Sequence, residues 1–484
     1  MTSRSLWYSP AVVYTAFAAA FITFRLILFL LGTTGSEYLL YQDYGESARD
    51  KPIGEMYRDR DIEYPHLAVL FGTAAGWVAD RLPADAHRWT AARPNAYHGD
   101  SYARYEAGLS VVLAALDVVC LVLVYLLGHN FYPAEGVHRR VGRLLVYTVA
   151  TGMLAPILYD RQDLVVAFFA LAALLTLANG WTVPGYVLLV VGTAYKLVPG
   201  LLLPVWVFAA ATRRSGPNAT FKRFIRATII EASLAGAILL VWPVATYYFG
   251  GGERGFVFLT FHSKRGLQLE APLAWPTMLL DPQAVVGHGY GSYNFVSPFA
   301  DQIAGILKWA MLLSVAVTGL IAGRGYWRMA RASERPSSGA LGIHALASAI
   351  LVWMAFILTN KVGSPQYLLW IAPLIPLLPL RGASAWCWTA LTIAACGLTS
   401  LVFPTFYKYV KGADVPDHPG TWAGPDGWCV VLLTARSLAL LAATLWLGVV
   451  VWRSTRPVPT ITPSSPRSLR HDSPVAQSVP VGRS

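Results

Sequence analysis

Charged residues are scarce in this chain: they make up only 13% of its 484 residues, whereas 55% are hydrophobic. This excludes the composition of ordinary soluble domains, in which about a quarter of the residues are charged. Acids are scarcer than bases, 26 against 38, which leaves a formal net charge of +12. The basic residues fall in short loops between apolar stretches, a pattern typical of membrane topology rather than of a nucleic-acid surface. We therefore expect no nucleic-acid partner.

Cysteine is also rare, and its placement excludes a disulfide framework or a metal cluster. The four cysteines all fall within or at the ends of apolar runs, at Cys120, Cys387, Cys396 and Cys429. Such isolated positions match none of the spacings that hold structural metals. We expect no metal and no cofactor.

Long apolar runs dominate the remainder, and runs of roughly 18 or more residues predict transmembrane helices. The first run has no small-residue cleavage site after it, so we expect a retained anchor helix. The fold class predicted is all-α, a polytopic helical bundle with roughly 11–13 spans. The expected spans are 10–32, 105–128, 142–158, 163–180, 183–196, 197–212, 227–248, 302–323, 341–359, 366–380, 384–403 and 430–452. The pair 183–196 and 197–212 could instead form one broken helix with a re-entrant segment.

The positive-inside rule orients these spans with both termini in the cytoplasm and the protein in the plasma membrane. The basic clusters then all lie inside: residues 139–143, 213–226, 324–335 and the Arg-rich tail. The membrane domain is expected to cover residues 1–452, and residues 453–484 are expected to form a disordered cytoplasmic tail because they are rich in Pro, Ser and Arg.

The opposite, outer face receives long loops that carry acids, a histidine and lysines. These segments are 33–104, 159–163, the hinge at Lys196, 249–301, 360–365 and 404–429. Within the first outer loop, the stretch 66–82 is apolar but short and flanked by charges, which predicts a helix lying along the membrane interface. Charges inside the spans are few and are predicted to be packing partners. They are Arg25, Asp117, Glu231 and Arg436.

Asp43 lies in the first outer loop, about ten residues after the first expected span. A carboxylate held near the membrane surface can act as a general base toward a hydroxyl group. The alternative is that Asp43 is one of several solvated acids. Further along the loop, acids alternate with arginines, which indicates a structural ion-pair cluster at least as strongly as catalysis. This stretch contains Arg58, Asp59, Arg60, Asp61 and Glu63.

A short turn between two spans carries Asp160, Arg161 and Asp163. Charged groups at the bilayer boundary must pair or face a wet cavity, because their burial is costly. Capping of a helix end by Asp160 or Asp163 is the alternative. Lys196 is expected at the outer end of a helix, where it could bind phosphate or extend its amine toward water.

Two further outer segments carry residues suited to a phosphate group. The first, FHSKRGLQLEA, contains His262, Arg265 and Glu270, and the second, NKVGSPQYLLW, contains Lys361 and Gln366. Arginine and histidine side chains are well matched to phosphate oxygens. A local pair between Arg265 and Glu270 is the simpler alternative. None of these segments indicates a binding site by itself. Their shared position on one face of the membrane does.

At these segments the chain resembles glycosyltransferase family 87, a group of membrane-embedded GT-C enzymes that includes polyprenol-phosphate-mannose-dependent mannosyltransferases. The resemblance rests on six stretches that occur in the family's order: YQDYGESA, MYRDRDIEYPHLA, LYDRQDL, AYKLVPGLLLP, FHSKRGLQLEA and NKVGSPQYLLW. The chain departs from the family where it has Tyr64-Pro65-His66 in place of Tyr-Pro-Pro, and Glu270-Ala271 in place of an acid-serine pair. Those departures concern substrate specificity more than fold.

The resemblance implies a GT-C fold, a polyprenyl-phosphate sugar donor and a glycolipid or glycan acceptor. It also implies that an acid of the first outer loop, Asp43, is the base of an inverting transfer. Asp160, Arg161, Asp163, Lys196, His262, Arg265, Glu270, Lys361 and Gln366 would bind substrate. A transporter or flippase is the alternative, but transporters concentrate polar groups near the midplane, often with inverted repeats. A polysaccharide ligase or a scaffold without catalytic activity would share the architecture.

Overall fold

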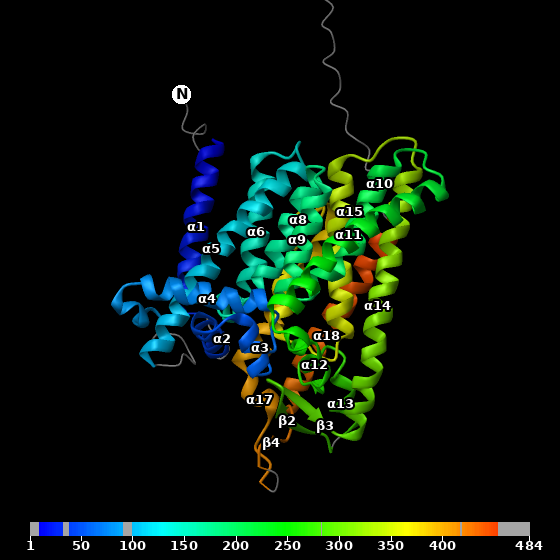
Figure 1. Cartoon of the computed structure of the whole chain (residues 1–484). Helices are drawn as coiled ribbons and strands as arrows, with labels where there is room; N and C mark the ends of the chain where they lie inside the picture. Colours follow the sequence, from blue (N-terminus) through cyan, green and yellow to red (C-terminus); the bar gives the residue numbers. More distant parts are fainter. Residues whose placement is uncertain (1–8, 32–37, 91–98, 282, 417–418, 454–484) are drawn as a thin grey trace, which may run out of the picture.

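The computed structural model describes residues 9–31, 38–90, 99–281, 283–416 and 419–453, and it is a bundle of membrane-crossing helices with an assembly of short elements at one end (Figure 1). Seven helices of the described residues are long and apolar enough to span a bilayer. They are α1 (Pro10–Leu31), α5 (Asp100–Phe131), α11 (Phe221–Phe249), α14 (Pro298–Arg331), α15 (Ser338–Thr359), α16 (Gly382–Ser400) and α18 (Gly427–Arg453). The predicted all-α, multi-pass fold is confirmed.

The remaining predicted spans between residues 137 and 215 form shorter helices. They are α6 (Val137–Gly152), α7 (Ala155–Leu158), α8 (Leu164–Ala178), α9 (Thr182–Tyr195), the 3₁₀ helix η3 (Val198–Leu202) and α10 (Leu203–Ser215). At 1.5 Å per residue, helices of this length are shorter than the hydrocarbon core. The break between α9 and α10 falls at Lys196, whose backbone is extended. Residues 183–212 are therefore two helices that meet at an abrupt break.

The span predicted at 366–380 is not an α-helix. It forms two consecutive 3₁₀ helices, η5 (Pro365–Trp370) and η6 (Ala372–Leu377). Pro365, Pro373 and Pro376 lack the amide hydrogen that an α-helix requires, which explains the difference. The segment is almost wholly buried inside the bundle. Such irregular backbone is tolerated at membrane depth only where other protein segments surround it.

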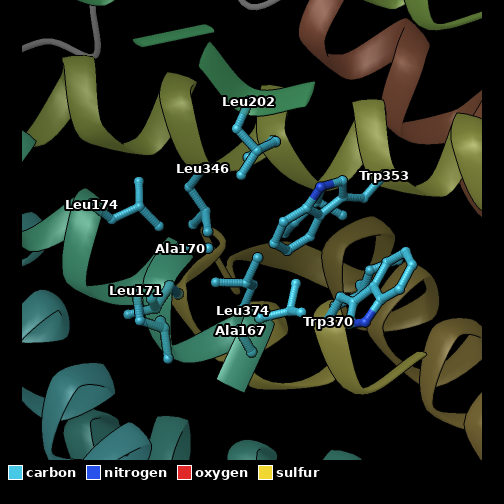
Figure 2. Packing of buried hydrophobic residues seen from close by; sticks show 14 of the residues in the cluster. Ala167, Ala170, Leu171, Leu174, Leu202, Leu346, Trp353, Trp370 and Leu374 are labelled. Carbon is cyan, nitrogen blue, oxygen red and sulfur yellow. The ribbon is translucent and has the colours of Figure 1, made fainter. Parts of the chain in front are cut away.

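The core of the bundle is centred on α15, which packs against α5, α8, α10, α14 and α18. Figure 2 shows side chains of α8, α15, η3, η5 and η6 meeting there. The Trp353 and Trp370 rings lie 6.1 Å apart in an edge-to-face arrangement. Small residues of α8, among them Ala167 and Ala170, are fully buried. Because small side chains let helix backbones approach closely, they suit helix packing inside a membrane.

Three of the four charges predicted within the spans form ion pairs, and the fourth, Arg436, donates a hydrogen bond to the backbone carbonyl of Glu270. Arg25 of α1 lies 2.8 Å from Asp117 of α5, and both side chains are buried. Glu231 of α11 lies 2.6 Å from Arg214 at the end of α10. A buried charge without a partner would be strongly destabilising, so these pairs also specify which helices are neighbours.

The outer segments form the assembly of short elements at one end of the bundle (Figure 1). Its helices are α2 (Tyr38–Asp50), α3 (Ile53–Asp59), α4 (His66–Arg81), η2 (Ala84–Trp89), η4 (Gly252–Phe256), α12 (Val257–Ser263), α13 (Trp275–Leu280), the π-helical turn η7 (Leu401–Thr405) and α17 (Tyr407–Lys411). The predicted interfacial helix is present as α4, which lies across the axis of the bundle (Figure 1).

A small antiparallel sheet, not predicted from the sequence, completes the assembly. Its order is β1 (Leu267–Gln268), β3 (Ser292–Val296), β2 (Val285–Gly289) and β4 (Thr421–Trp422). The β2–β3 turn has positive φ at both Tyr290 and Gly291, the conformation that two-residue hairpins favour. The sheet joins loop 249–301 to loop 404–429, which the sequence placed on the same face.

The basic loops meet at the opposite end. The backbone of Asn218, between α10 and α11, donates a hydrogen bond to the carbonyl of Ala332, beyond α14. Arg324 of α14 donates to the carbonyl of Trp452, near the end of α18. The predicted tail, apart from Arg453, lies outside the described residues. The two sets of loops therefore separate to the two ends of the bundle, as the charge pattern predicted.

We predict that the basic end faces the cytoplasm. Cysteines introduced at the exposed positions Ser333 and Ala413 should report this, after the exposed Cys387 has been replaced by serine. A membrane-impermeant maleimide added to intact cells should label Ala413→Cys and leave Ser333→Cys unlabelled until the cells are permeabilised. The reverse pattern would invert the predicted orientation.

Candidate functional site

A cavity of about 740 Å³ lies where the outer assembly meets the membrane-crossing helices. Its walls come from the residues just before α4, from α12 and the chain after it, and from the β2–β3 hairpin, η5, α14 and the turn before α8. Segments separated by hundreds of residues thus share one enclosed space. The predicted site residues that line it are Arg161, Lys196, His262, Arg265, Glu270, Lys361 and Gln366.

Three predicted site residues do not line the cavity. Asp163 lies directly behind it, whereas Asp160 is buried and lies 3.4 Å from the Arg161 guanidinium. Asp43 lies on α2, where its half-exposed carboxylate is 2.7 Å from Arg60. The predicted cations therefore all line the cavity, whereas most of the predicted acids lie outside its lining.

The Asp163 carboxylate fixes two of the side chains that line the cavity. It accepts hydrogen bonds from the Lys196 amine at 2.7 Å and from the Trp370 indole at 2.6 Å. Asp163 occupies the N-cap position of α8, yet its side chain makes no capping bond. The alternative role of Asp163 as a capping side chain is therefore not observed, and Lys196 is paired instead of extending toward water.

Arg265 pairs with Glu63, at 2.8 Å, and both side chains are more than 90% buried. The alternative considered from the sequence, a local pair between Arg265 and Glu270, is not formed, because strand β1 lies between the two residues. Burial raises the pKa of Glu63, although Arg265 and Lys196 act to lower it. Glu63 also lines the cavity. A carboxylate and a guanidinium from distant segments are thus presented together.

The other acids near Glu63 do not form the local ion-pair cluster that the sequence suggested. They pair with bases outside the stretch, Asp59 with Lys51 at 3.0 Å and Asp61 with Arg254 at 2.8 Å. The pair between Asp61 and Arg254 joins the first outer loop to the second. These exposed pairs contribute little stability on their own, but they show that the two loops are in contact.

His262 is uncharged in this environment. Burial and repulsion from Arg265 and Lys196 lower the pKa of its imidazole to about 3. The ring lines the cavity beside those two cations. A neutral imidazole can donate one hydrogen bond and accept another, so His262 is suited to bind hydroxyl groups.

Lys361 holds two outer loops together at the rim. Its amine donates to the carbonyl of Ser263 at 3.0 Å and to the carbonyl of Arg265. Burial and the nearby charge of Lys308 lower its pKa. Lys361 is thus a partly desolvated cation at the cavity, and its charge remains available to an anion since both protein partners are neutral.

The far side of the cavity contains Arg161 and Glu270. Burial lowers the pKa of the Arg161 guanidinium to about 9, which leaves it cationic at neutral pH. Burial also raises the pKa of Glu270, although a hydrogen bond with Tyr407 opposes the rise. Behind Glu270, Arg436 of α18 donates to its backbone carbonyl. The backbone of Glu270 is therefore held in place by a side chain of a membrane-crossing helix.

Apolar side chains of the membrane-crossing helices form the remaining wall. Leu307 and Met311 of α14 and Phe356 of α15 line the cavity, with the exposed Lys308 at its edge. The neighbouring surface of α14 exposes Ile306, Trp309 and Leu312. The cavity therefore joins a cationic, hydrogen-bonding region to apolar surface suited to a lipid chain.

Several lining residues could not have been selected from the sequence. They are the aromatic residues Tyr64, Tyr293, Tyr367, Trp370, Phe403 and Tyr407. Because 13% of the chain is aromatic, no single ring stands out in the sequence. The Lys196 amine lies about 6 Å from the ring centres of Tyr64, Tyr367 and Trp370, within the range of cation–π attraction.

No model of a known protein family matches the chain, and no curated protein matches it. Among solved structures, the crystal structure of the Archaeoglobus fulgidus oligosaccharyltransferase in the apo form matches with a TM-score of 0.34 and 11% identity. The match covers 95% of this chain and 57% of that one, so the chain spans little more than half the length of the archaeal protein.

The low pKa of His262 predicts how stability changes with pH. The unfolded chain binds a proton at this histidine below the ordinary pKa of about 6.5, whereas the folded protein does so only near 3. Lowering the pH from about 7 to 5 should therefore lower the apparent unfolding temperature. His262→Gln should reduce this decrease, measured by a thermal scan in detergent, and replacement of the exposed His129 by glutamine should not. Equal slopes for parent and H262Q would exclude a buried neutral His262.

Proposed function

We propose that this protein is a membrane-embedded, inverting glycosyltransferase of the GT-C type. In this proposal it transfers a hexose, with mannose as the first candidate, from a polyprenyl-phosphate sugar to a hydroxyl group of a glycolipid or glycan acceptor outside the cytoplasm. The observation that carries the proposal is the cavity itself. It unites cations, carboxylates and an apolar wall of membrane-crossing helices at one end of the bundle.

The cations are suited to the phosphate of the donor. Arg161, Lys196, Arg265 and Lys361 all line the cavity. A lipid phosphate that leaves the sugar carries its negative charge at the bilayer surface, and fixed cations in a partly desolvated site stabilise such developing charge. The apolar residues of α14 and α15 would contact the polyprenyl chain, which places the sugar toward the outer assembly.

The proposed reaction is a single displacement at the anomeric carbon. The acceptor oxygen forms the new glycosidic bond from one face while the bond to the phosphate oxygen breaks on the other, so the configuration inverts. The acceptor proton passes to a carboxylate, and the polyprenyl phosphate leaves with the bonding electron pair. Binding both substrates in one cavity lowers the entropic cost of bringing them together.

Asp43 is the proposed base, on the strength of the family resemblance. Its carboxylate is paired with Arg60 outside the cavity lining, so the acceptor would have to reach it from the aqueous side. The next residue, Tyr44, is buried and hydrogen bonded to the backbone of Glu63. The geometry therefore offers Glu63 as the second candidate, since its carboxylate already lines the cavity.

A transporter or flippase is the competing function. The distribution of charge favours an enzyme, because the buried pairs inside the bundle, such as Arg25 with Asp117, are closed ion pairs between helices. They do not form a series of sites along a path. Clusters of polar groups line the two cavities at the ends of the bundle instead.

The function can be tested with purified protein in proteoliposomes that contain radiolabelled polyprenyl-phosphate mannose and a panel of short mannosides and glycolipids. We expect a labelled glycoside and equimolar polyprenyl phosphate. Donors that carry glucose or galactose would then define the sugar preference. Movement of the labelled donor across the bilayer without release of polyprenyl phosphate would establish the flippase alternative and exclude the enzyme.

The base can be assigned with two isosteric variants. If Asp43 is the base, Asp43→Asn should lower the transfer rate by roughly 10²–10⁴, the range attributed to general-base catalysis, and should leave donor binding nearly unchanged. Glu63→Gln should then act mainly on donor binding, because it removes the partner of Arg265. The comparison requires kcat and the donor KM of both variants. Near-parental transfer by D43N together with a large loss of kcat in E63Q would assign the base to Glu63.

The phosphate site predicts a specific effect at Lys361. Lys361→Gln keeps a hydrogen-bond donor and removes the charge, so donor binding should weaken about tenfold to a hundredfold. Lys264→Gln is the matched control, because Lys264 lies in the adjacent outer loop, is exposed and does not line the cavity. Donor affinity can be measured by competition with unlabelled polyprenyl phosphate. Equal affinities in the two variants would contradict a phosphate site at Lys361.

A further inference from the structure

A second cavity, of about 770 Å³, lies at the basic end of the bundle, between the starts of α6 and α16. Its lining includes His138, Arg139, Arg143 and Arg381, with Glu135 as the acid among its lining residues and Trp386 at the edge. No step of the proposed transfer uses it, because the first cavity is lined by other residues, where the outer assembly meets the membrane-crossing helices. Its residues therefore need a separate explanation.

The single acid is already neutralised. Arg143 donates to both carboxylate oxygens of Glu135 at 2.8 Å and also to the carbonyls of Pro376 and Leu378. Its guanidinium lies 3.7 Å from the centre of the Tyr132 ring. Arg143 is therefore a structural residue with its donors in use, and the pair adds no net charge to the cavity.

Two cations remain. Arg139 and Arg381 line the same cavity, and neither has an ion-pair partner within the part of the chain that the structure describes. They come from different elements, Arg139 from the first turn of α6 and Arg381 from the residue before α16. Both side chains are exposed, and Glu135, which is already paired with Arg143, offsets their charge only in part. An anion bound in this space would therefore be attracted by both guanidinium groups.

The backbone adds to the positive potential. Both α6 and α16 begin at this cavity, with Gly136 and Arg381 at their N-cap positions, and neither helix has a capping side chain or an acid in its first turn. Free amide groups and the helix dipole make such N-termini favourable for anions. The cavity therefore combines two helix N-termini with two arginines that form no close ion pair with any residue that the structure describes.

We propose that this cavity binds a phosphate group, either the headgroup of an anionic membrane lipid or free phosphate. Arginine forks match phosphate oxygens in geometry and charge. Basic pockets between transmembrane helices on the cytoplasmic side are known sites for anionic headgroups. The half-exposed Trp386 on α16 lies at the edge of the cavity, where an interfacial aromatic ring can contact the glycerol and upper chain region of a lipid.

The test uses the purified full-length protein and the variant R139A/R381A. The matched control R328A/R335A removes two charges from exposed arginines of the 324–335 loop at the same end of the bundle. Native mass spectrometry should show retention of phosphatidylglycerol over phosphatidylcholine by the parent and the control, with affinity about tenfold or more weaker in R139A/R381A. Thermal scans with inorganic phosphate against chloride at equal ionic strength form the second arm. Monodispersity and helical circular dichroism confirm that each variant is folded.

The two arms distinguish the sources of the phosphate. Selective retention of phosphatidylglycerol without stabilisation by inorganic phosphate identifies a lipid headgroup site. Stabilisation by inorganic phosphate that is lost in R139A/R381A, without lipid preference, identifies a site for the free anion. The proposal is overturned if the parent shows neither effect, or if R328A/R335A weakens binding as much as R139A/R381A does, because binding would then reflect only the general charge of this face.

Discussion

The first cavity, at the end of the bundle predicted to face outward, depends on one buried carboxylate. Asp163 accepts bonds from Lys196 and Trp370, and so joins the start of α8, the break after α9 and the 3₁₀ helix η5. Asp163 and Lys196 would each be costly to bury alone, because an uncompensated charge inside a protein is strongly destabilising. Their mutual satisfaction places Lys196 at the cavity with its amine near three aromatic rings. The cation of the proposed phosphate site is thus positioned from behind, by a residue that does not line the cavity.

The segment from Lys361 to Arg381 connects the two cavities. At one end of the segment, Lys361, Gln366 and Trp370 line the first cavity, and at the other end Arg381 lines the second. Between them, η5 and η6 run buried through the bundle. Near the inner end, Arg143 and Tyr132 bind carbonyl groups that a 3₁₀ helix leaves without partners. The prolines that prevent an α-helix here therefore create a need for side-chain donors, and the bundle supplies them.

Much of the fold could be predicted because its cause is local. Each long apolar run became a helix, and the separation of basic loops from acidic and aromatic loops was reproduced at the two ends of the bundle. The prediction was wrong at 366–380, where an apolar run was taken as a membrane-crossing α-helix although it contains prolines. It also missed the small sheet, whose strands are short and in which β2 pairs with β4 about 135 residues further along the chain. Seven of the ten residues named for the site line one cavity, which reflects the shared face rather than any motif.

The sequence by itself determined that the protein is a multi-pass helical membrane protein, which loops lie together at each end of the bundle, and which residue types are available at the end predicted to face outward. Those properties follow from transfer of individual segments between water and lipid, which depends on composition and order alone. Only the tertiary structure decided the partners. It joined Arg265 to Glu63 rather than to Glu270, Lys196 to Asp163, and Asp43 to Arg60. The reason is physical: a buried charge takes the partner that the packing of distant helices brings within reach, and no local pattern encodes that distance.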